Sequence, residues 1–149
     1  MEITLTPPYA STGQADAILD MFSRINPKKI NSKFIVENNI ATAPNASTVI
    51  RFVKWMGIID EDNSVISEVS NKLRLVGKDR DIFISELIKK SYKDVFEEVN
   101  LEQARKEDLM NFFIHKYNFG PAPARNASAL LSHLCEKYGI PISEELKKE

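Results

Sequence analysis

Few side chains in this 149-residue sequence could carry out catalysis, and their spacing argues against it. His133 and Cys135 stand two residues apart in a segment expected to be helical, so they point to different faces and cannot form a nucleophile–base pair. The sequence contains no Cys/His cluster with metal-ligand spacing and no glycine-rich phosphate loop. The run Asp60-Glu61-Asp62 could bind a hard cation, although a solvated acidic turn is the expectation. We therefore predict a protein that is not an enzyme and holds neither a metal nor a cofactor.

The residues best suited to recognition lie in and before an expected helix at residues 45–57, which follows a shorter helix and a turn. In a helix-turn-helix the second helix presents its N-terminal residues to base edges in the major groove of DNA. The candidates on this helix are Asn45, Ser47, Thr48, Arg51 and Lys54. Three cations upstream could contact backbone phosphates, namely Lys28, Lys29 and Lys33. Arg51 can bond guanine in a bidentate manner, and Asn45 could read adenine or bond a phosphate.

Two features of the same region keep an alternative open. Arg51 and Lys54 are also what an ordinary solvated helix face would carry, because charged residues usually lie outside. The acidic run that follows the helix would repel phosphate if it lay near a duplex. The first hypothesis is thus a DNA-binding or regulatory protein, and the second is a protein–protein interaction module that uses the same fold without DNA.

The elements that would position these residues resemble a winged helix-turn-helix. Apolar residues recur at helical spacing over residues 14–25, and Asn26-Pro27 ends that helix. A short second helix starts at Asn31 or Ser32, which are suitable N-caps. After the 45–57 helix, two short β-branched runs flank the turn-forming residues 60–64 and predict a small β-hairpin. Trp55 could staple this hairpin to the helix or present an exposed aromatic ring to a partner, and core packing is the expectation.

The rest of the chain predicts further helices. A stripe of apolar residues indicates one long packed helix over residues 79–100 that connects two halves. Two more helices are expected at residues 107–117 and 127–138, separated by a proline-rich turn at 120–123. The first dozen residues should form an extended arm, and residues 143–149 should form a frayed tail. The fold class is mainly α: a winged-helix-like unit at 14–76, the connecting helix, and a second helix-turn-helix-like unit at 105–142, within a single compact domain.

The second unit is predicted because the chain repeats itself. Asn45-Ala46-Ser47 recurs as Asn126-Ala127-Ser128, 81 residues later, and apolar residues follow both copies at matching positions. Upstream, Phe34-Ile35 and Asn39 match Phe113-Ile114 and Asn118, and both copies close on Gly-Ile. Chance similarity between two amphipathic helices is the alternative. In this alignment His133 takes the place of Phe52, so it is expected to be a partly buried packing residue.

The order of these segments resembles a widespread prokaryotic domain family without an established function. The resemblance rests on a tyrosine-containing arm and a Gly-apolar-Ile-Asp junction, and it extends through the central helix and the closing helix that ends in Gly-Ile: "PPYASTGQADAILDMF", "WMGIIDEDNSV", "FISELIKKSYKDVFEEV" and "NASALLSHLCEKYGI". It covers nearly the whole chain and implies a helical, winged-helix-like fold. It implies no catalytic residues.

Composition sets the remaining limits. The hydrophobic share of 43% and the charged share of 28% are those of an ordinary folded protein. The single Cys135 cannot form an internal disulfide, which fits a reducing compartment. The chain has no apolar run that could span a membrane and no signal peptide at its start, so we expect a cytoplasmic protein. The net charge of −1 argues against a strongly basic nucleic-acid binder, and the mild excess of positive charge in residues 1–59 would support a local basic face. The expected partners are double-stranded DNA, a second copy in a homodimer, or another protein.

Overall fold

A computed structural model describes residues 6–147 of the chain, and in that range the fold is mainly helical. The elements in chain order are α1 (Thr12–Met21), α2 (Ser32–Glu37), the 3₁₀ turn η1 (Ala43–Asn45), α3 (Ala46–Trp55), α4 (Ser67–Leu73), α5 (Gly77–Ser91), α6 (Lys93–Glu98), α7 (Lys106–Tyr117), α8 (Pro121–Lys137) and α9 (Glu144–Lys147). The predicted mainly α class is confirmed.

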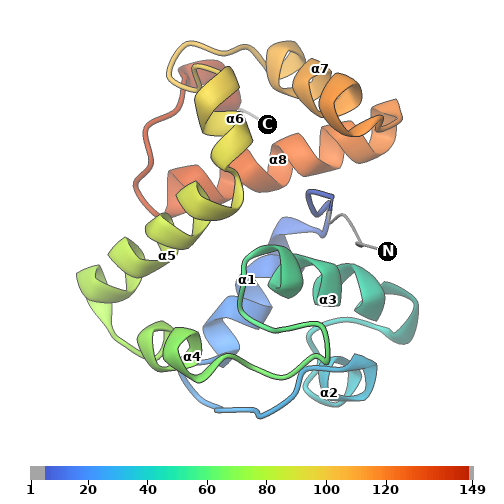
Figure 1. The fold of residues 1–149 in the computed structure, drawn as a ribbon, viewed down its shortest axis with the longest axis vertical. Helices are drawn as coiled ribbons and strands as arrows, with labels where there is room; N and C mark the ends of the chain where they lie inside the picture. Colours follow the sequence, from blue (N-terminus) through green and yellow to red (C-terminus); the bar gives the residue numbers. More distant parts are fainter. Residues whose placement is uncertain (1–5, 148–149) are drawn as a thin grey trace.

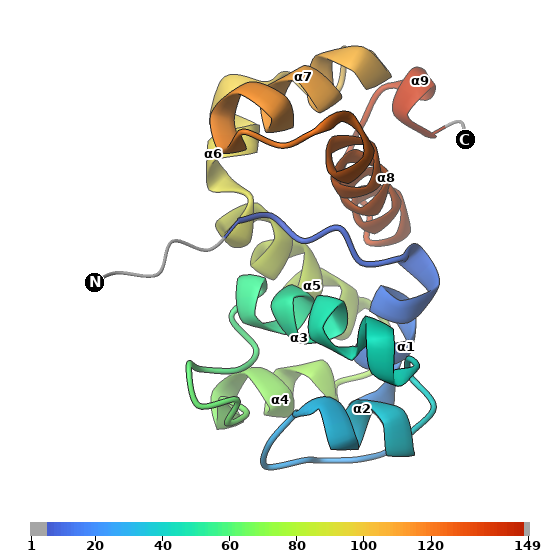
Figure 2. The same cartoon turned by 90° about the vertical axis from the view of Figure 1, so that its right-hand side faces the viewer.

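The helices form two groups that α5 connects (Figure 1). Helices α1 to α4 lie together in the lower half of the view, and α6 to α9 lie in the upper half. A segment of the N-terminal arm, residues 6–11, runs between α3 and α8 (Figure 2). Pro7, Pro8 and Ala10 of this arm are buried, so it forms part of the interior between the two groups. Residues 1–5 of the predicted arm lie outside the described range.

Local capping explains where the first helices begin. The side chain of Ser11 accepts a hydrogen bond from the Gln14 amide at 3.1 Å, and Asn31 accepts one from Phe34 at 2.9 Å. Each satisfies an amide that the first helical turn leaves without a partner. Helix α1 ends at Met21, earlier than predicted, because residues 22–25 continue only as hydrogen-bonded turns before Pro27.

The predicted β-hairpin does not form a pair of strands in the described residues. Among residues 6–147 strand-like pairing is limited to isolated antiparallel bridges, one between Ile59 and Val65 and one between Lys29 and Ser64. The carboxylate of Asp60 closes the turn by accepting from the amides of Asp62 and Ser64 at 2.9 and 3.0 Å. The returning segment cannot extend into a strand because the next residue, Ile66, is already the N-cap of α4. Helix α4 was not predicted.

The predicted long helix over 79–100 is also wrong, because the chain breaks at Tyr92. This residue has φ −104° and ψ 29°, outside the helical region, and α6 leaves the line of α5 there (Figure 1). The predicted apolar stripe is nevertheless buried on both sides of the break, from Ile84 through Ile88 to Val95. The break turns the Tyr92 ring inward, where it lies 5.4 Å from the Trp55 ring.

Two expectations for the C-terminal part need correction. The proline-rich turn predicted at 120–123 belongs to α8, which begins at Pro121, because proline lacks only an amide that a first helical turn would leave unpaired. The tail predicted to fray instead forms α9 as far as Lys147. The Ser143 amide donates to the Leu101 carbonyl at 2.8 Å, and Leu146 is buried. Residues 148–149 lie outside the described range.

The two copies of the repeat share their backbone geometry. Asn39 and Asn118, at the ends of α2 and α7, both have φ 57°, in the left-handed region. Gly57 and Gly139, after α3 and α8, have φ 75° and 78°. The residue after each glycine donates to a carbonyl five positions earlier, at 2.9 Å from Ile58 and 2.8 Å from Ile140, as in a Schellman helix end. Chance similarity between two amphipathic helices would not require these matches.

Candidate nucleic-acid interface

Helix α3 has one buried face and one outer stripe. Ala46, Val49, Phe52 and Val53 are buried, at the spacing of a helix that packs along one side. The outer stripe consists of Ser47, Arg51 and Lys54, which recur at four and three residues and so lie above one another on the helix. Ser47 and Arg51 are exposed, and Lys54 is half-buried.

Arg51 contacts the N-terminal arm. Its Nη1 donates to the hydroxyl of Tyr9 at 3.4 Å, and the Tyr9 ring lies edge-on to Phe119 with 6.2 Å between ring centroids. Tyr9 therefore links the outer stripe of α3 to the turn between α7 and α8. The prediction from sequence did not include Tyr9 in the candidate site.

The residues at the start of α3 are arranged differently from the prediction. The helix proper begins at Ala46, after the 3₁₀ turn, and its N-cap Asn45 makes no side-chain capping bond. Instead, the side-chain Nδ2 of Asn45 donates to Thr42 Oγ1 at 3.2 Å. Asn45 is exposed and Thr48 is half-buried, so both lie at the rim of the outer stripe.

The three upstream lysines lie apart from this stripe. The carbonyl of Lys28 accepts from the Val65 amide at 2.9 Å, and Lys29 pairs with Ser64, so both stand next to the acidic turn. Lys33 forms an ion pair with Glu37 on α2 at 3.9 Å. Figure 2 shows α2 on the opposite side of α3 from the arm that Arg51 contacts.

The exposed acids of the turn stand beside two of these lysines. Asp60, Glu61 and Asp62 are all exposed and follow directly on Ile59, which pairs with Val65. Their charges lower the positive potential around Lys28 and Lys29, since exposed charges interact over about 8 Å at physiological salt. The outer stripe of α3 is consequently the stronger candidate for contact with an anion.

His133, on α8, lies in a contact between α8 and α1. Its Nε2 is 2.8 Å from Asp16 Oδ2, and Lys137 Nζ is 3.1 Å from Asp16 Oδ1. Burial lowers the pKa of Lys137 and its hydrogen bond with Asp16 raises it, with a net rise. The prediction that His133 is partly buried is confirmed, since its side chain is 34% exposed. Its polar contact with Asp16, 117 residues away, was not predicted.

Cys135 is itself a residue of α8 and is buried. Burial raises the pKa of its thiol to about 12, against a smaller opposing effect of Lys89. A thiol with this pKa is protonated at neutral pH and is a poor nucleophile. Among residues 6–147 no group of three or more His, Cys, Asp and Glu side chains is placed to hold a metal ion.

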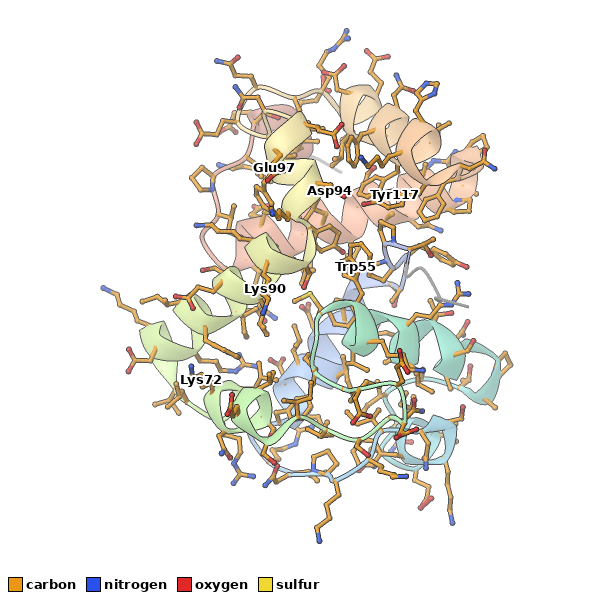
Figure 3. The ribbon with its side chains drawn as sticks, viewed as in Figure 1. Trp55, Lys72, Lys90, Asp94, Glu97 and Tyr117 are labelled. Carbon is orange, nitrogen blue, oxygen red and sulfur yellow. The ribbon has the colours of Figure 1, made fainter. Side chains whose placement is uncertain are left out.

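Trp55 packs between the two groups of helices, so the packing prediction is confirmed. Its ring lies edge-on to Tyr92 at 5.4 Å and to Tyr117 at 6.4 Å. Figure 3 shows it between the end of α3 and the side chains of Asp94 and Tyr117. Burial and the nearby Asp94 carboxylate raise the pKa of the Tyr117 hydroxyl. Trp55 thus joins the two groups of helices.

These observations define a mainly α-helical protein in which two similar helix pairs, α2–α3 and α7–α8, are joined through α5. Residues 8–135 match the model of a family of unknown function, DUF5343, and the chain belongs to that family. Neither a search of curated proteins nor a search of solved structures found a match. Within residues 6–147 the helices are all too short or too polar to cross a membrane.

Proposed function

We propose that the protein binds double-stranded DNA as a transcription regulator, with α3 as its recognition helix. The observation that carries this proposal is the outer stripe of α3, where Ser47 and Arg51 are exposed beside Lys54 and no carboxylate is paired with Arg51 or Lys54 in the described chain. In a helix-turn-helix this is the helix that enters the major groove.

The order of backbone contacts supports a winged-helix arrangement for residues 14–76. Ile30 donates to the Asn63 carbonyl at 3.0 Å, and Val65 donates to the Lys28 carbonyl at 2.9 Å. Ile66 donates to the Ile58 carbonyl at 2.9 Å. The segment between α1 and α2 therefore lies beside the turn that follows α3, which is the order of a winged helix with a minimal wing.

Each candidate residue has a distinct role in this proposal. Arg51 bonds guanine through two guanidinium donors, and Tyr9 holds that guanidinium from the arm side. Asn45, Ser47 and Thr48 contact base edges or phosphates at the start of α3. Lys54 contacts a phosphate one turn further along the helix. Outside the stripe, the backbone of the flanking duplex is contacted by Lys28, Lys29 and Lys33.

Fluorescence polarisation with random duplex DNA tests the proposal. Phosphate contacts predict an affinity that falls about tenfold or more between roughly 50 and 200 mM salt. Arg51→Ala should weaken binding about tenfold on duplexes that offer the guanine, from the loss of roughly 1–3 kcal/mol for that base contact, whereas Lys54→Ala should weaken binding to all sequences and reduce the salt slope by about one. Lys90→Ala, which removes an exposed charge from α5, is the matched control and should bind as wild type does. An absence of binding at the lower salt would refute DNA recognition.

The second candidate function is a protein–protein interaction module without DNA binding. The observation in its favour is that three large apolar side chains are exposed near the start of α5: Leu75 and Val76 in the turn after α4, and Ile82 within α5. Regulators of this type also often bind paired half-sites as dimers, so a homodimer is compatible with both functions. Self-association in a protein that fails to bind DNA would favour the module.

A further inference from the structure

The guanidinium of Arg51 is held by a neutral partner. Its Nη1 donates to the hydroxyl of Tyr9 at 3.4 Å. Arg105, by contrast, has its charge compensated by Glu107 at 2.9 Å and by Asp108 at 3.2 Å. A hydroxyl can accept a hydrogen bond without carrying a charge, so Tyr9 orients the Arg51 side chain and leaves its positive charge uncompensated.

The contact with Tyr9 involves only one side of this guanidinium. The group carries five N–H donors in a planar fork, and a bidentate contact uses two donors that lie along one edge. The bond to Tyr9 is made by Nη1. It does not use the edge formed by Nε and Nη2, which therefore still matches the O6 and N7 acceptors of guanine.

Tyr9 is itself positioned by the C-terminal helix group. Its ring lies edge-on to Phe119, in the turn between α7 and α8, with 6.2 Å between centroids and 87° between planes. Phe119 in turn stacks on the fully buried Phe113 at 6.3 Å and 18°. The neighbours of Tyr9 in the arm, Pro8 and Ala10, are both buried. The position of the Tyr9 hydroxyl is thus set by the second helix pair and the buried arm.

We propose that the second helix pair takes part in base recognition by positioning Arg51 through Phe119 and Tyr9. Phe119 fixes the Tyr9 ring, the Tyr9 hydroxyl holds Nη1, and the opposite edge of the guanidinium faces guanine. An arginine that is oriented in advance loses less side-chain freedom on binding than one that moves freely in solvent. Tyr9 and Phe119 are positioning residues for Arg51. This inference rests on the proposed function of α3 and adds the second helix pair to it.

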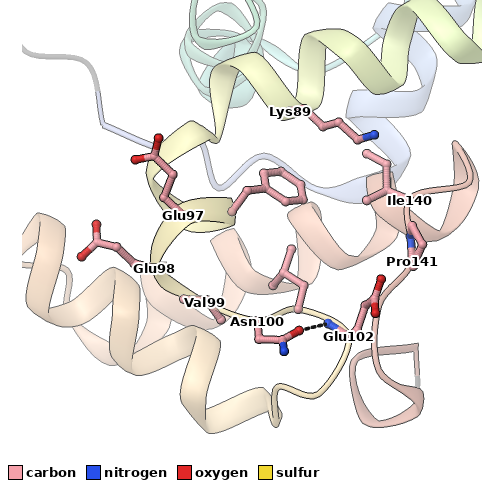
Figure 4. A pocket seen from close by; sticks show the side chains of 10 residues that line it. Lys89, Glu97, Glu98, Val99, Asn100, Glu102, Ile140 and Pro141 are labelled. Atoms are coloured by element: carbon pink, nitrogen blue, oxygen red, sulfur yellow. Dashed lines mark hydrogen bonds between the residues drawn. The ribbon is translucent and has the colours of Figure 1, made fainter.

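Two sites outside this set of contacts provide control variants. Phe83 of α5 is half-buried like Phe119, but its ring packs under Lys72 of α4, with Nζ 5.3 Å from the ring centroid. Phe83→Leu therefore controls for the loss of a half-buried ring. Glu102 lines a groove of the C-terminal group, between the end of α6 and the segment at 140–141 (Figure 4). Glu102→Gln controls for a change in that group that leaves Phe119 intact.

The ratio of affinities for two duplexes of equal length tests the proposal, one of random sequence and one of A·T pairs only. The wild type should prefer the guanine-containing duplex about tenfold. Tyr9→Phe, which removes one oxygen atom, and Phe119→Leu should each lower this preference about two- to threefold, since one exposed hydrogen bond is lost. Neither should change the salt slope, because no phosphate contact is removed. In an Arg51→Ala background Tyr9→Phe should have no further effect.

A second measurement needs no DNA. The NMR order parameter of the Arg51 Nε–H bond should be higher in the wild type and both controls than in Tyr9→Phe and Phe119→Leu. Equal mobility of Arg51 in all five proteins overturns the positioning role. So does a guanine preference that depends on Arg51 but is unchanged by Tyr9→Phe, and in that case the proposed function of α3 stands. A wild type that orders Arg51 but binds neither duplex refutes the proposed function, and base recognition by the second helix pair fails with it.

Discussion

The matched glycines after α3 and α8 give a quantitative prediction about the repeat. Gly57 and Gly139 have φ 75° and 78°, and a Cβ added at either position would meet no atom within 4 Å. Replacement by alanine therefore causes no steric overlap with neighbours, and the cost comes from the backbone alone. A left-handed conformation costs an L-residue about 1–2 kcal/mol. The stiffer unfolded chain returns about 0.4–1 kcal/mol. We expect each substitution to destabilise the protein by about 1 kcal/mol.

Gly13 provides the control for this substitution. It lies in the first turn of α1, its φ is outside the left-handed region, and a Cβ there would also meet nothing within 4 Å. Gly13→Ala should stabilise the protein by up to about 0.5–1 kcal/mol, because alanine favours a helix over glycine. The same chemical change is thus predicted to act with opposite signs at positions that differ only in backbone conformation.

Equilibrium unfolding in urea, with thermal unfolding as a second measurement, tests the series. For a chain of this size about 1 kcal/mol corresponds to a shift of roughly 2–4 °C in Tm. The double variant at Gly57 and Gly139 should lose about 2 kcal/mol, because the two turns share no hydrogen-bond partner. If either variant matched Gly13→Ala in stability, that turn would not be left-handed. If only one of the two were destabilised, the equivalence of the two helix pairs would fail.

Two further predictions concern buried polar side chains. The folded pKa of Cys135 is raised to about 12, so stability should be complete below the ordinary thiol pKa and fall as pH rises toward 12, by at most about 1.4 kcal/mol per pH unit. The urea midpoint of Cys135→Ala should therefore decline less steeply with rising alkaline pH than that of the wild type, and an equal slope would contradict the raised pKa of the thiol. The second prediction concerns the Tyr92 hydroxyl, which is buried and has no partner among the described residues. Tyr92→Phe should raise Tm by removing a desolvation cost of about 1–3 kcal/mol. A lower Tm would show that the hydroxyl is in fact satisfied.

Local patterns predicted much of this fold because they are set by neighbouring residues. The N-cap at Asn31 and the glycine after α3 depend on side chains and φ angles within one helical turn. The buried stripe of α5 and α6 follows the helical period, but the same period continues unchanged through Tyr92. No local signal marks the break there, and the Tyr92 ring that it places packs against Trp55, far away in the sequence.

The same distinction applies to the candidate site. The exposure of Ser47 and Arg51 follows from the helical period, whereas the contact between Arg51 and Tyr9 joins residues 42 positions apart. The contact between His133 and Asp16 spans 117 positions. Helix α9 was missed for a similar reason, since it is held by a bond from Ser143 to Leu101. Pairings of this kind depend on how the two groups of helices meet.

The repeat separates architecture from binding. Both closing helices keep a buried alanine at the matching position, Ala46 at the start of α3 and Ala127 within α8, and a left-handed glycine after their ends, so the scaffold is common to them. In α3 the outer stripe carries Arg51 and Lys54, whereas the matching positions of α8 carry Ser132 and Cys135, which are both buried. Helix α8 is covered because it packs against α1, α5, α7 and α9. The second helix pair therefore has no free stripe with which to copy the proposed DNA contact.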